Sequence, residues 1–180
     1  MIESEVVAAS IATLAVEPAK KAAQRTNSNL TGGTTIFLGS STTAKSQAKA
    51  VVAALEQPGL VFLPWWEAFT PGNTLLQELD VIRGRVDGAL LLFSPESETT
   101  IRGNSVSTPN LNILFEFGYF YGHFGKKRVG MLKYNDFYLP SDFGGYIHIA
   151  GSRFFKRAKV VKVGKRPTTE FNRWVKGLRP

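Results

Sequence analysis

The sequence predicts an α/β fold, in which a doubly wound sheet of about five parallel strands is flanked by helices. From residue 34 onward, short apolar runs alternate with segments of helical periodicity, an order that is typical of parallel sheets. One run, residues 89–93, is apolar at every position. Continuous apolar runs are expected in strands that are covered on both faces, so this run supports the same fold.

The expected elements follow one another in a regular order. Strands are predicted at residues 35–38, 59–63, 89–93, 129–132 and 146–149. Helices are predicted at residues 43–56, 75–82, 109–124 and 169–178. Ligands of such folds bind beyond the carboxyl ends of the strands. The binding edge is therefore expected in three loops, at residues 39–42, 64–73 and 95–110.

The first 33 residues are expected to form a helical segment and a linker, separate from a domain at residues 34–180. Residues 2–26 form an alanine-rich stretch that is interrupted at Pro18. The polar text that follows ends in Gly32 and Gly33, which is typical of a linker.

Composition excludes several classes of protein. The chain has 180 residues, of which 43% are hydrophobic, enough for one core. It has no run of about 18 apolar residues and begins with an acidic segment, so neither a membrane span nor a secretory signal is expected. With no cysteine and two histidines, it offers no disulfide, and no metal site is expected. We expect a cytoplasmic protein.

The net charge of +8 is concentrated in the last third of the chain. Residues 126–180 hold 14 Lys and Arg against 3 Asp and Glu, whereas residues 1–125 hold 8 against 11. Such asymmetry is compatible with a nucleic-acid surface, with a phosphate-bearing ligand or with a solvated face. Nucleic-acid binding is the least favoured of these, because no known reader motif accompanies the charges.

The predicted helix at residues 109–124 carries an unusual polar stripe. Thr108 is expected to cap it, with Pro109 as its first residue. Apolar side chains cover most of its circumference, so the helix is expected to be largely buried. Its polar residues fall on one narrow stripe: Asn112, Glu116, Tyr119 and His123.

Glu116 is the candidate for chemistry on this helix. A carboxylate among apolar side chains is costly unless it has a partner or faces a cavity, and burial raises its pKa, as in many catalytic acids. The structural alternative is an ion pair with Lys or Arg. The helix dipole offers little help so far from the first turn. The residues alone leave the catalytic and the structural interpretation open.

Two segments at the predicted binding edge also have two interpretations each. Gly39, Ser40 and Ser41 lie between a strand and a helix, where they can hold a phosphate or simply cap the helix. Trp65 and Trp66 can complete a core or stack on a ring of a ligand. No P-loop, Gly-x-Gly-x-x-Gly motif or nucleophile elbow follows a strand, so the common nucleotide and hydrolase sites are not expected.

Five segments together resemble a known family. They are Gly39–Ser41, Trp65–Leu75, Asp87–Pro95, Asn112–Phe120 and Pro140–Gly145. Over residues 34–150 the chain resembles the TIR-like family of predicted nucleotide-binding proteins, which occurs in bacterial cyclic-nucleotide antiphage systems. The most specific elements are Asn-x-x-Phe-Glu-x-Gly at 112–118 and Pro-Ser-Asp-x-x-Gly at 140–145.

The resemblance implies a TIR fold with a flavodoxin-like sheet, and an activity. Glu116 falls at the family's catalytic position and would cleave NAD⁺ to nicotinamide and linear or cyclic ADP-ribose, NAD⁺ being a substrate and no cofactor being required. A cyclic-nucleotide sensor, fused or separate, would drive self-assembly into an oligomer or filament during abortive infection. The residues expected to contact the substrate are Gly39, Ser40, Ser41, Trp66, Phe69, Asn112 and Asp142.

Two departures and two alternatives accompany the resemblance. Asn110 stands where the family often has Arg, and Glu96-Ser97 stands where the family has an acidic pair, which places substrate affinity or regulation in question.

One alternative function is that of an enzyme like the nucleoside deoxyribosyltransferases, which also use a carboxylate at an N-glycosidic bond. The other is a non-catalytic TIR scaffold or adaptor that only oligomerises.

Overall fold

The computed structural model describes residues 33–134, 137–139, 143, 148–150 and 165–178. The predicted helical segment and linker at residues 1–33 lie outside these residues except for Gly33. Asp142 and most of the Pro140–Gly145 motif also lie outside the described residues.

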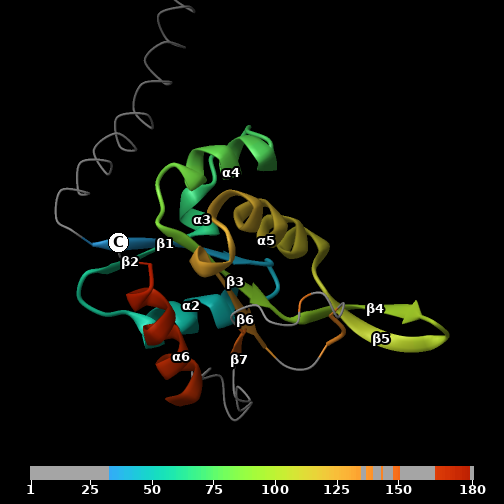
Figure 1. Cartoon of the computed structure of the whole chain (residues 1–180). Coiled ribbons are helices and arrows are strands. Elements are labelled where there is room, and N and C mark those ends of the chain that lie inside the picture. The colour runs from blue at the N-terminus through green and yellow to red at the C-terminus, as the bar shows by residue number, and fades with distance from the viewer. Residues whose placement is uncertain (1–32, 135–136, 140–142, 144–147, 151–164, 179–180) are drawn as a thin grey trace, which may run out of the picture. The chain divides into compact units, whose positions relative to one another are not determined.

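Five parallel strands form the central sheet, as predicted. They are β1 (Thr34–Ser40), β2 (Leu60–Pro64), β3 (Gly88–Phe93), β6 (Val129–Lys133) and β7 (His148–Ala150). Their order is β2-β1-β3-β6-β7, and all four neighbouring pairs are parallel (Figure 1). The chain leaves β2 on one side of β1 and returns as β3 on the other side. This reversal between β1 and β3 is the switch point of a flavodoxin-like sheet.

Helices cover both faces of the sheet (Figure 1). The helices on one face are α2 (Lys45–Leu55) and α6 (Lys165–Lys176), and those on the other are α3 (Trp65–Ala68), α4 (Leu75–Arg83) and α5 (Leu111–Phe124). Along β1, Ile36 and Leu38 pack into the first layer and Phe37 packs into the second. Since each face is buried, all three are apolar, which confirms the doubly wound fold.

Helix α5 begins two residues later than predicted. Asn110 is its N-cap, and its side chain accepts a hydrogen bond of 2.9 Å from the backbone N–H of Asn112. The predicted cap Thr108 and first residue Pro109 belong instead to the preceding strand. The prediction was wrong because the fixed backbone angle of proline also suits the end of an edge strand.

The expectation that α5 is largely buried was also wrong. Ile113, Phe117 and Phe120 are buried against the sheet, but the side chains of Leu111 and Phe115 are 76% and 47% exposed. A helix that lies on the outer face of one sheet has only one side to bury. The apolar residues on its other side are therefore available for contacts outside the domain.

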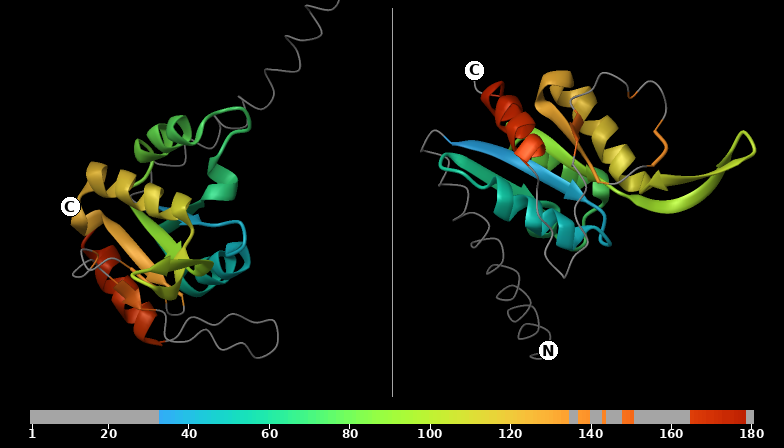
Figure 2. Two further views of the ribbon diagram at one scale, coloured as in Figure 1. Left: turned by 90° about the vertical axis from the view of Figure 1, so that its right-hand side faces the viewer. Right: turned by 90° about the horizontal axis from the view of Figure 1, so that it is seen from below.

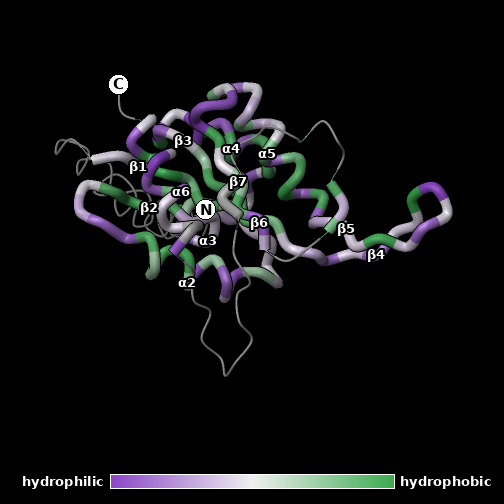
Figure 3. Tube along the Cα trace, turned by 60° about the horizontal axis from the view of Figure 1, so that its bottom comes forward, coloured by the Kyte–Doolittle hydropathy of each residue, from purple (hydrophilic) through white to green (hydrophobic). Residues whose placement is uncertain are grey.

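Residues 95–110, expected as a loop, form an antiparallel hairpin. Its strands are β4 (Pro95–Ile101) and β5 (Asn104–Pro109), which make a separate two-stranded sheet. Arg102 and Gly103 form the turn with φ of 50° and 80°, the left-handed pair that a two-residue hairpin requires. The hairpin extends away from the central sheet, and its tip is hydrophilic (Figures 2 and 3).

No helix in the described part of the chain is both long enough and apolar enough to cross a membrane.

Candidate functional site

A cavity of about 250 Å³ lies at the carboxyl end of β1, beside the switch point of the sheet. Its lining comes from the loop after β1, from α3, from the start of α4 and from the start of α5. The lining residues are Ser40, Ser41, Thr42, Trp65, Phe69, Leu75, Asn110, Asn112, Ile113 and Glu116. The predicted binding edge is therefore hollowed where doubly wound folds hold their ligands.

Glu116 is the buried acid of this cavity. It extends from the second turn of α5 and is only 5% exposed. Its Oε2 atom is buried and has no hydrogen-bond partner among the described residues. Burial raises the pKa of Glu116 from 4.5 to about 7. A buried, unpaired carboxylate oxygen in a cavity is unfavourable for stability and typical of a site that receives a ligand.

Gly39 makes room for this carboxylate. It lies in β1 opposite Leu91 of β3, and a Cβ at this position would be 2.8 Å from Oε2 of Glu116. The same Cβ would be 2.3 Å from Cδ1 of Leu91. Gly39 was expected to contact the substrate. It does not belong to the cavity lining, and the structure places it beneath the acid.

Ser40 and Ser41 line the cavity and also hold the loop before α2. Ser40 Oγ accepts a hydrogen bond of 2.9 Å from Nε1 of Trp65. Ser41 Oγ accepts one of 3.1 Å from the backbone N–H of Ala44, which closes the turn that leads into the helix. The N-cap of α2 is Ala44, which has no side-chain cap, so the two serines do not cap the helix but shape the loop before it.

Trp65, and not Trp66, forms the aromatic wall of the cavity together with Phe69. Trp66 packs in the layer on the other face of the sheet, with Val52 and Phe62. The segment is a short helix rather than the expected loop, so successive residues turn by about 100°. Trp65 and Phe69, four residues apart, share a face, and this spacing is the signal in the sequence that could have identified Trp65.

Only the first half of the predicted polar stripe reaches the cavity. Asn112 is exposed at its mouth, one turn before Glu116. Tyr119 donates a hydrogen bond to Asp80 of α4, and His123 is exposed. At 1.5 Å per residue, the seven-residue step from Glu116 to His123 corresponds to about 10 Å along the helix. The stripe is continuous on α5, but the helix carries its end away from the site.

Glu96 was noted only as part of the altered acidic pair, and its hydrogen bonds to two lining residues of the cavity were not predicted. Its Oε1 accepts hydrogen bonds from Ser41 and, at 2.8 Å, from Ser94. Its Oε2 accepts one of 3.3 Å from Nδ2 of Asn110. Leu75 and Ile113 were also missed as lining residues, because nothing in their local pattern distinguishes them from the core.

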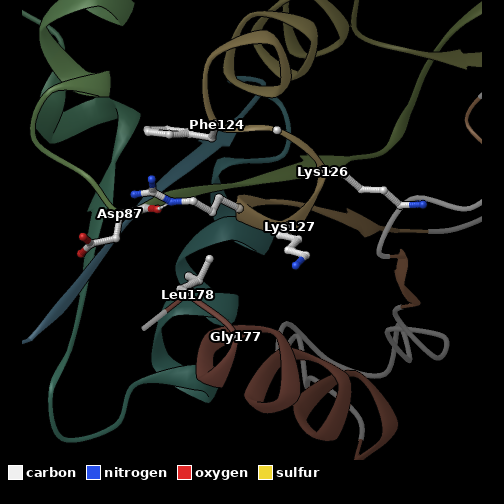
Figure 4. A pocket seen from close by; sticks show the side chains of 8 residues that line it. Asp87, Phe124, Lys126, Lys127, Gly177 and Leu178 are labelled. Atoms are coloured by element: carbon white, nitrogen blue, oxygen red, sulfur yellow. Dashed lines mark hydrogen bonds between the residues drawn. The ribbon is translucent and has the colours of Figure 1, made fainter. Parts of the chain in front are cut away.

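A second cleft, of about 660 Å³, lies at the amino-terminal edge of the sheet (Figure 4). Its lining includes Asp87, Lys126, Lys127 and Arg128. Arg128 donates from Nε to the carbonyl oxygen of Asp87, and its guanidinium lies 4.8 Å from the ring centroid of Phe124. The cleft is basic, but its lining contains no buried acid, and it lies at the end of the strands opposite to Glu116.

Sequence comparison identifies the domain. Residues 35–153 match the family model described as CAP12/Pycsar effector protein, TIR domain. The chain is 30% identical over 112 residues to CD-NTase-associated protein 12 of Lachnospiraceae bacterium (strain RUG226), covering 62% of this chain and 35% of that protein. It is 28% identical over 113 residues to the Pycsar effector protein PaPycTIR of Pseudomonas aeruginosa, covering 61% and 37%.

A eukaryotic protein is similar over a shorter stretch. The protein tirC of Dictyostelium discoideum is 30% identical over 90 residues, which cover 43% of this chain and 45% of that protein. The matched region thus spans about a third of the two bacterial relatives and under half of tirC. The family model, the parallel sheet and the order of its motifs agree: this chain belongs to the family of CAP12/Pycsar effector TIR domains.

Proposed function

We propose that this domain cleaves the bond between nicotinamide and ribose in NAD⁺, with Glu116 as the catalytic carboxylate. One observation carries the proposal: Glu116 lines the cavity at the switch point, and its Oε2 is buried without a partner among the described residues. Membership of a TIR effector family supports the same activity.

The chemistry requires little more than one negative charge in a sheltered place. Breaking the N-glycosidic bond passes through an oxocarbenium-like state, in which positive charge develops on the ribose. The Glu116 carboxylate would stabilise this charge and accept hydrogen bonds from the ribose hydroxyls. Water then adds to the anomeric carbon and releases a proton, giving ADP-ribose. Because nicotinamide departs as a neutral molecule, no general acid is needed.

The cavity is suited to one end of the dinucleotide. Its volume of about 250 Å³ is below the roughly 300–1,000 Å³ of most small-molecule sites, so we assign it to the nicotinamide and its ribose. Trp65 and Phe69 would offer flat surfaces to the ring, and Asn112, which also lines the cavity, would orient the ribose or the acid. Ser40 and Ser41 would contact the substrate at the rim.

Self-assembly is the second part of the proposal. Leu111 and Phe115 expose apolar surface on α5, close in sequence to Asn110 and Asn112, which line the cavity. Exposed apolar residues of this kind are common where proteins associate. We propose that a cyclic-nucleotide signal, acting through a sensor on the same or another chain, promotes this association during antiphage defence.

The test is nicotinamide release from NAD⁺ over a wide range of protein concentration, for the wild type and for Glu116→Gln. Glutamine keeps the shape of the side chain and removes its charge. We expect wild-type activity that rises more steeply than the protein concentration, and at least about a hundredfold less in the variant, as for loss of an electrostatic catalytic group.

Other outcomes would identify the alternatives. If crowded wild-type protein and Glu116→Gln are equally inactive while both still associate, the domain is a scaffold or adaptor. If the wild type transfers deoxyribose between added nucleobases and leaves NAD⁺ intact, it is an enzyme like the nucleoside deoxyribosyltransferases. Either result would overturn the NAD⁺-cleaving function.

A further inference from the structure

Side chains from three segments of the chain meet at the carboxylate of Glu96. Ser41 belongs to the loop after β1, Ser94 follows β3, and Asn110 caps α5. Both carboxylate oxygens are used: Oε1 accepts from the two serines and Oε2 from the asparagine. Ser41 and Asn110 both line the cavity. Glu96 is not itself a lining residue, but it joins two residues that line the cavity from different elements.

A bulge in the hairpin accounts for the direction in which Glu96 points, toward Ser41, Ser94 and Asn110. Pro95 pairs with Pro109 and Ser97 pairs with Thr108, which leaves Glu96 as an extra residue in β4. Such a bulge turns a side chain out of the regular alternation of a strand and is common beside active sites. The next acid, Glu98, follows the regular pattern and accepts hydrogen bonds of 3.0 Å from Ser105 and Ser107 within the exposed hairpin.

Two backbone turns depend on the groups that Glu96 holds. Ser41 Oγ donates a hydrogen bond to Glu96, and the same oxygen accepts one from the backbone N–H of Ala44. The Asn110 side chain donates to Glu96 from Nδ2 while its Oδ1 accepts from the N–H of Asn112. Loss of the carboxylate would release the side chains that close the turn before α2 and cap α5.

We infer that Glu96 is a positioning residue for substrate binding: it holds the Ser41 loop and the Asn110 cap of α5 at the spacing that the substrate requires. This inference rests on the proposed function. Glu96 has no contact with Glu116 among the described hydrogen bonds, so its removal should weaken substrate binding more than it slows the bond cleavage.

The first experiment compares Glu96→Ala with the matched control Glu98→Ala in nicotinamide release. Each variant removes one acid of the same hairpin that accepts hydroxyl hydrogen bonds. Because charge-assisted hydrogen bonds are lost, we expect Glu96→Ala to raise KM about tenfold and to change kcat less than about threefold. Glu98→Ala should leave both constants within about twofold of the wild type.

The second experiment moves the negative charge from Glu96 to its partner Asn110. Asn110→Asp alone would set two carboxylates against each other and raise KM about tenfold. Adding Glu96→Gln restores the pair, because the Gln amide donates to Asp while its oxygen still accepts from the serines. We expect KM within about threefold of the wild type for this double variant. Asn110→Asp with Glu98→Gln has the same net charge and should not recover.

Amide hydrogen exchange at Ala44 and Asn112 tests the inference without turnover. We expect both amides to exchange about tenfold faster in Glu96→Ala and in Asn110→Asp than in the wild type. Wild-type exchange rates should return when Asn110→Asp is combined with Glu96→Gln, but not when it is combined with Glu98→Gln. Equal behaviour of Glu96→Ala and Glu98→Ala, or equal rescue of Asn110→Asp by either glutamine, would overturn the positioning role. If the wild type releases no nicotinamide, the proposed function fails and the exchange data alone decide on Glu96.

Discussion

The carboxylate of Glu116 rests against the bare backbone of Gly39, where an ideal Cβ would be 2.8 Å from Oε2. The two residues are 77 positions apart, one in strand β1 and the other in helix α5. Without a side chain on the strand, the helix can hold an acid directly over the carboxyl end of the sheet. The acid is thereby 5% exposed, and burial raises its pKa to about 7.

Gly39→Ala is expected to destabilise the fold and to displace the carboxylate of Glu116. The new methyl would overlap Cδ1 of Leu91 at 2.3 Å as well as Oε2 of Glu116. Overpacking of this kind costs about 1–3 kcal/mol of unfolding free energy. Denaturant unfolding measures this cost. Gly118→Ala is the control, because Gly118 lies in a helix and a Cβ added there would meet nothing within 4 Å, so this variant should gain up to about 1 kcal/mol. Equal stability of the two variants would show that the space beneath Glu116 is not tight.

Activity is expected to rise with pH through neutrality. Only the ionised form of Glu116 can stabilise a positive charge on the ribose, and its pKa is about 7. At pH 6 about one molecule in ten is ionised, so kcat/KM should be about tenfold below its plateau above pH 8. Initial rates of nicotinamide release between pH 5 and 9 give this profile, with circular dichroism to show that the fold is retained. A flat profile over this range would mean that the acid is not titrating near neutrality.

Glu116→Gln is expected to stabilise the fold at neutral and alkaline pH. The pKa of Glu116 is higher in the folded state than its ordinary value of 4.5, so the wild type loses stability as pH rises from about 4.5 to about 7. The loss then stays constant at about 3 kcal/mol, an order-of-magnitude value. Glutamine cannot ionise, so the variant should match the wild type below pH 4.5 and exceed it above pH 7. Unfolding curves at about pH 4 and about pH 8 test this, and a difference that does not change with pH would contradict it.

Trp65 and Trp66 are expected to respond differently to the same substitution. Trp65→Phe keeps an aromatic wall but loses the hydrogen bond of 2.9 Å to Ser40, so KM should rise about fivefold. Trp66→Phe should leave KM within about twofold, because Trp66 packs on the other face of the sheet. The pair is well matched, since Nζ of Lys45 lies 5.3 Å from the centroid of each ring. A rise in KM for Trp66→Phe alone would place the ring pocket elsewhere.

Local patterns in the sequence determined the architecture. Apolar runs such as residues 89–93 identify a strand that is buried on both faces, because every consecutive residue of such a strand must be apolar. The pair Asn112 and Glu116 was predicted for the same reason, since a spacing of four residues places two side chains on one face of any helix. The order of strands and helices, the α5 acid and the edge of the sheet that carries it were therefore accessible from the sequence.

Tertiary structure decided which side chains meet. Two partners of Glu96, Ser41 and Asn110, lie 55 and 14 residues away, and they meet it at a bulge in a hairpin that was expected as a loop. The same applies to Gly39, which was predicted as a substrate contact and which, in the fold, leaves the space that the Glu116 carboxylate occupies. Periodicity along the chain reports which face of an element is buried. Periodicity does not indicate which side chains of other elements pack against that face, because this depends on elements that are remote in sequence.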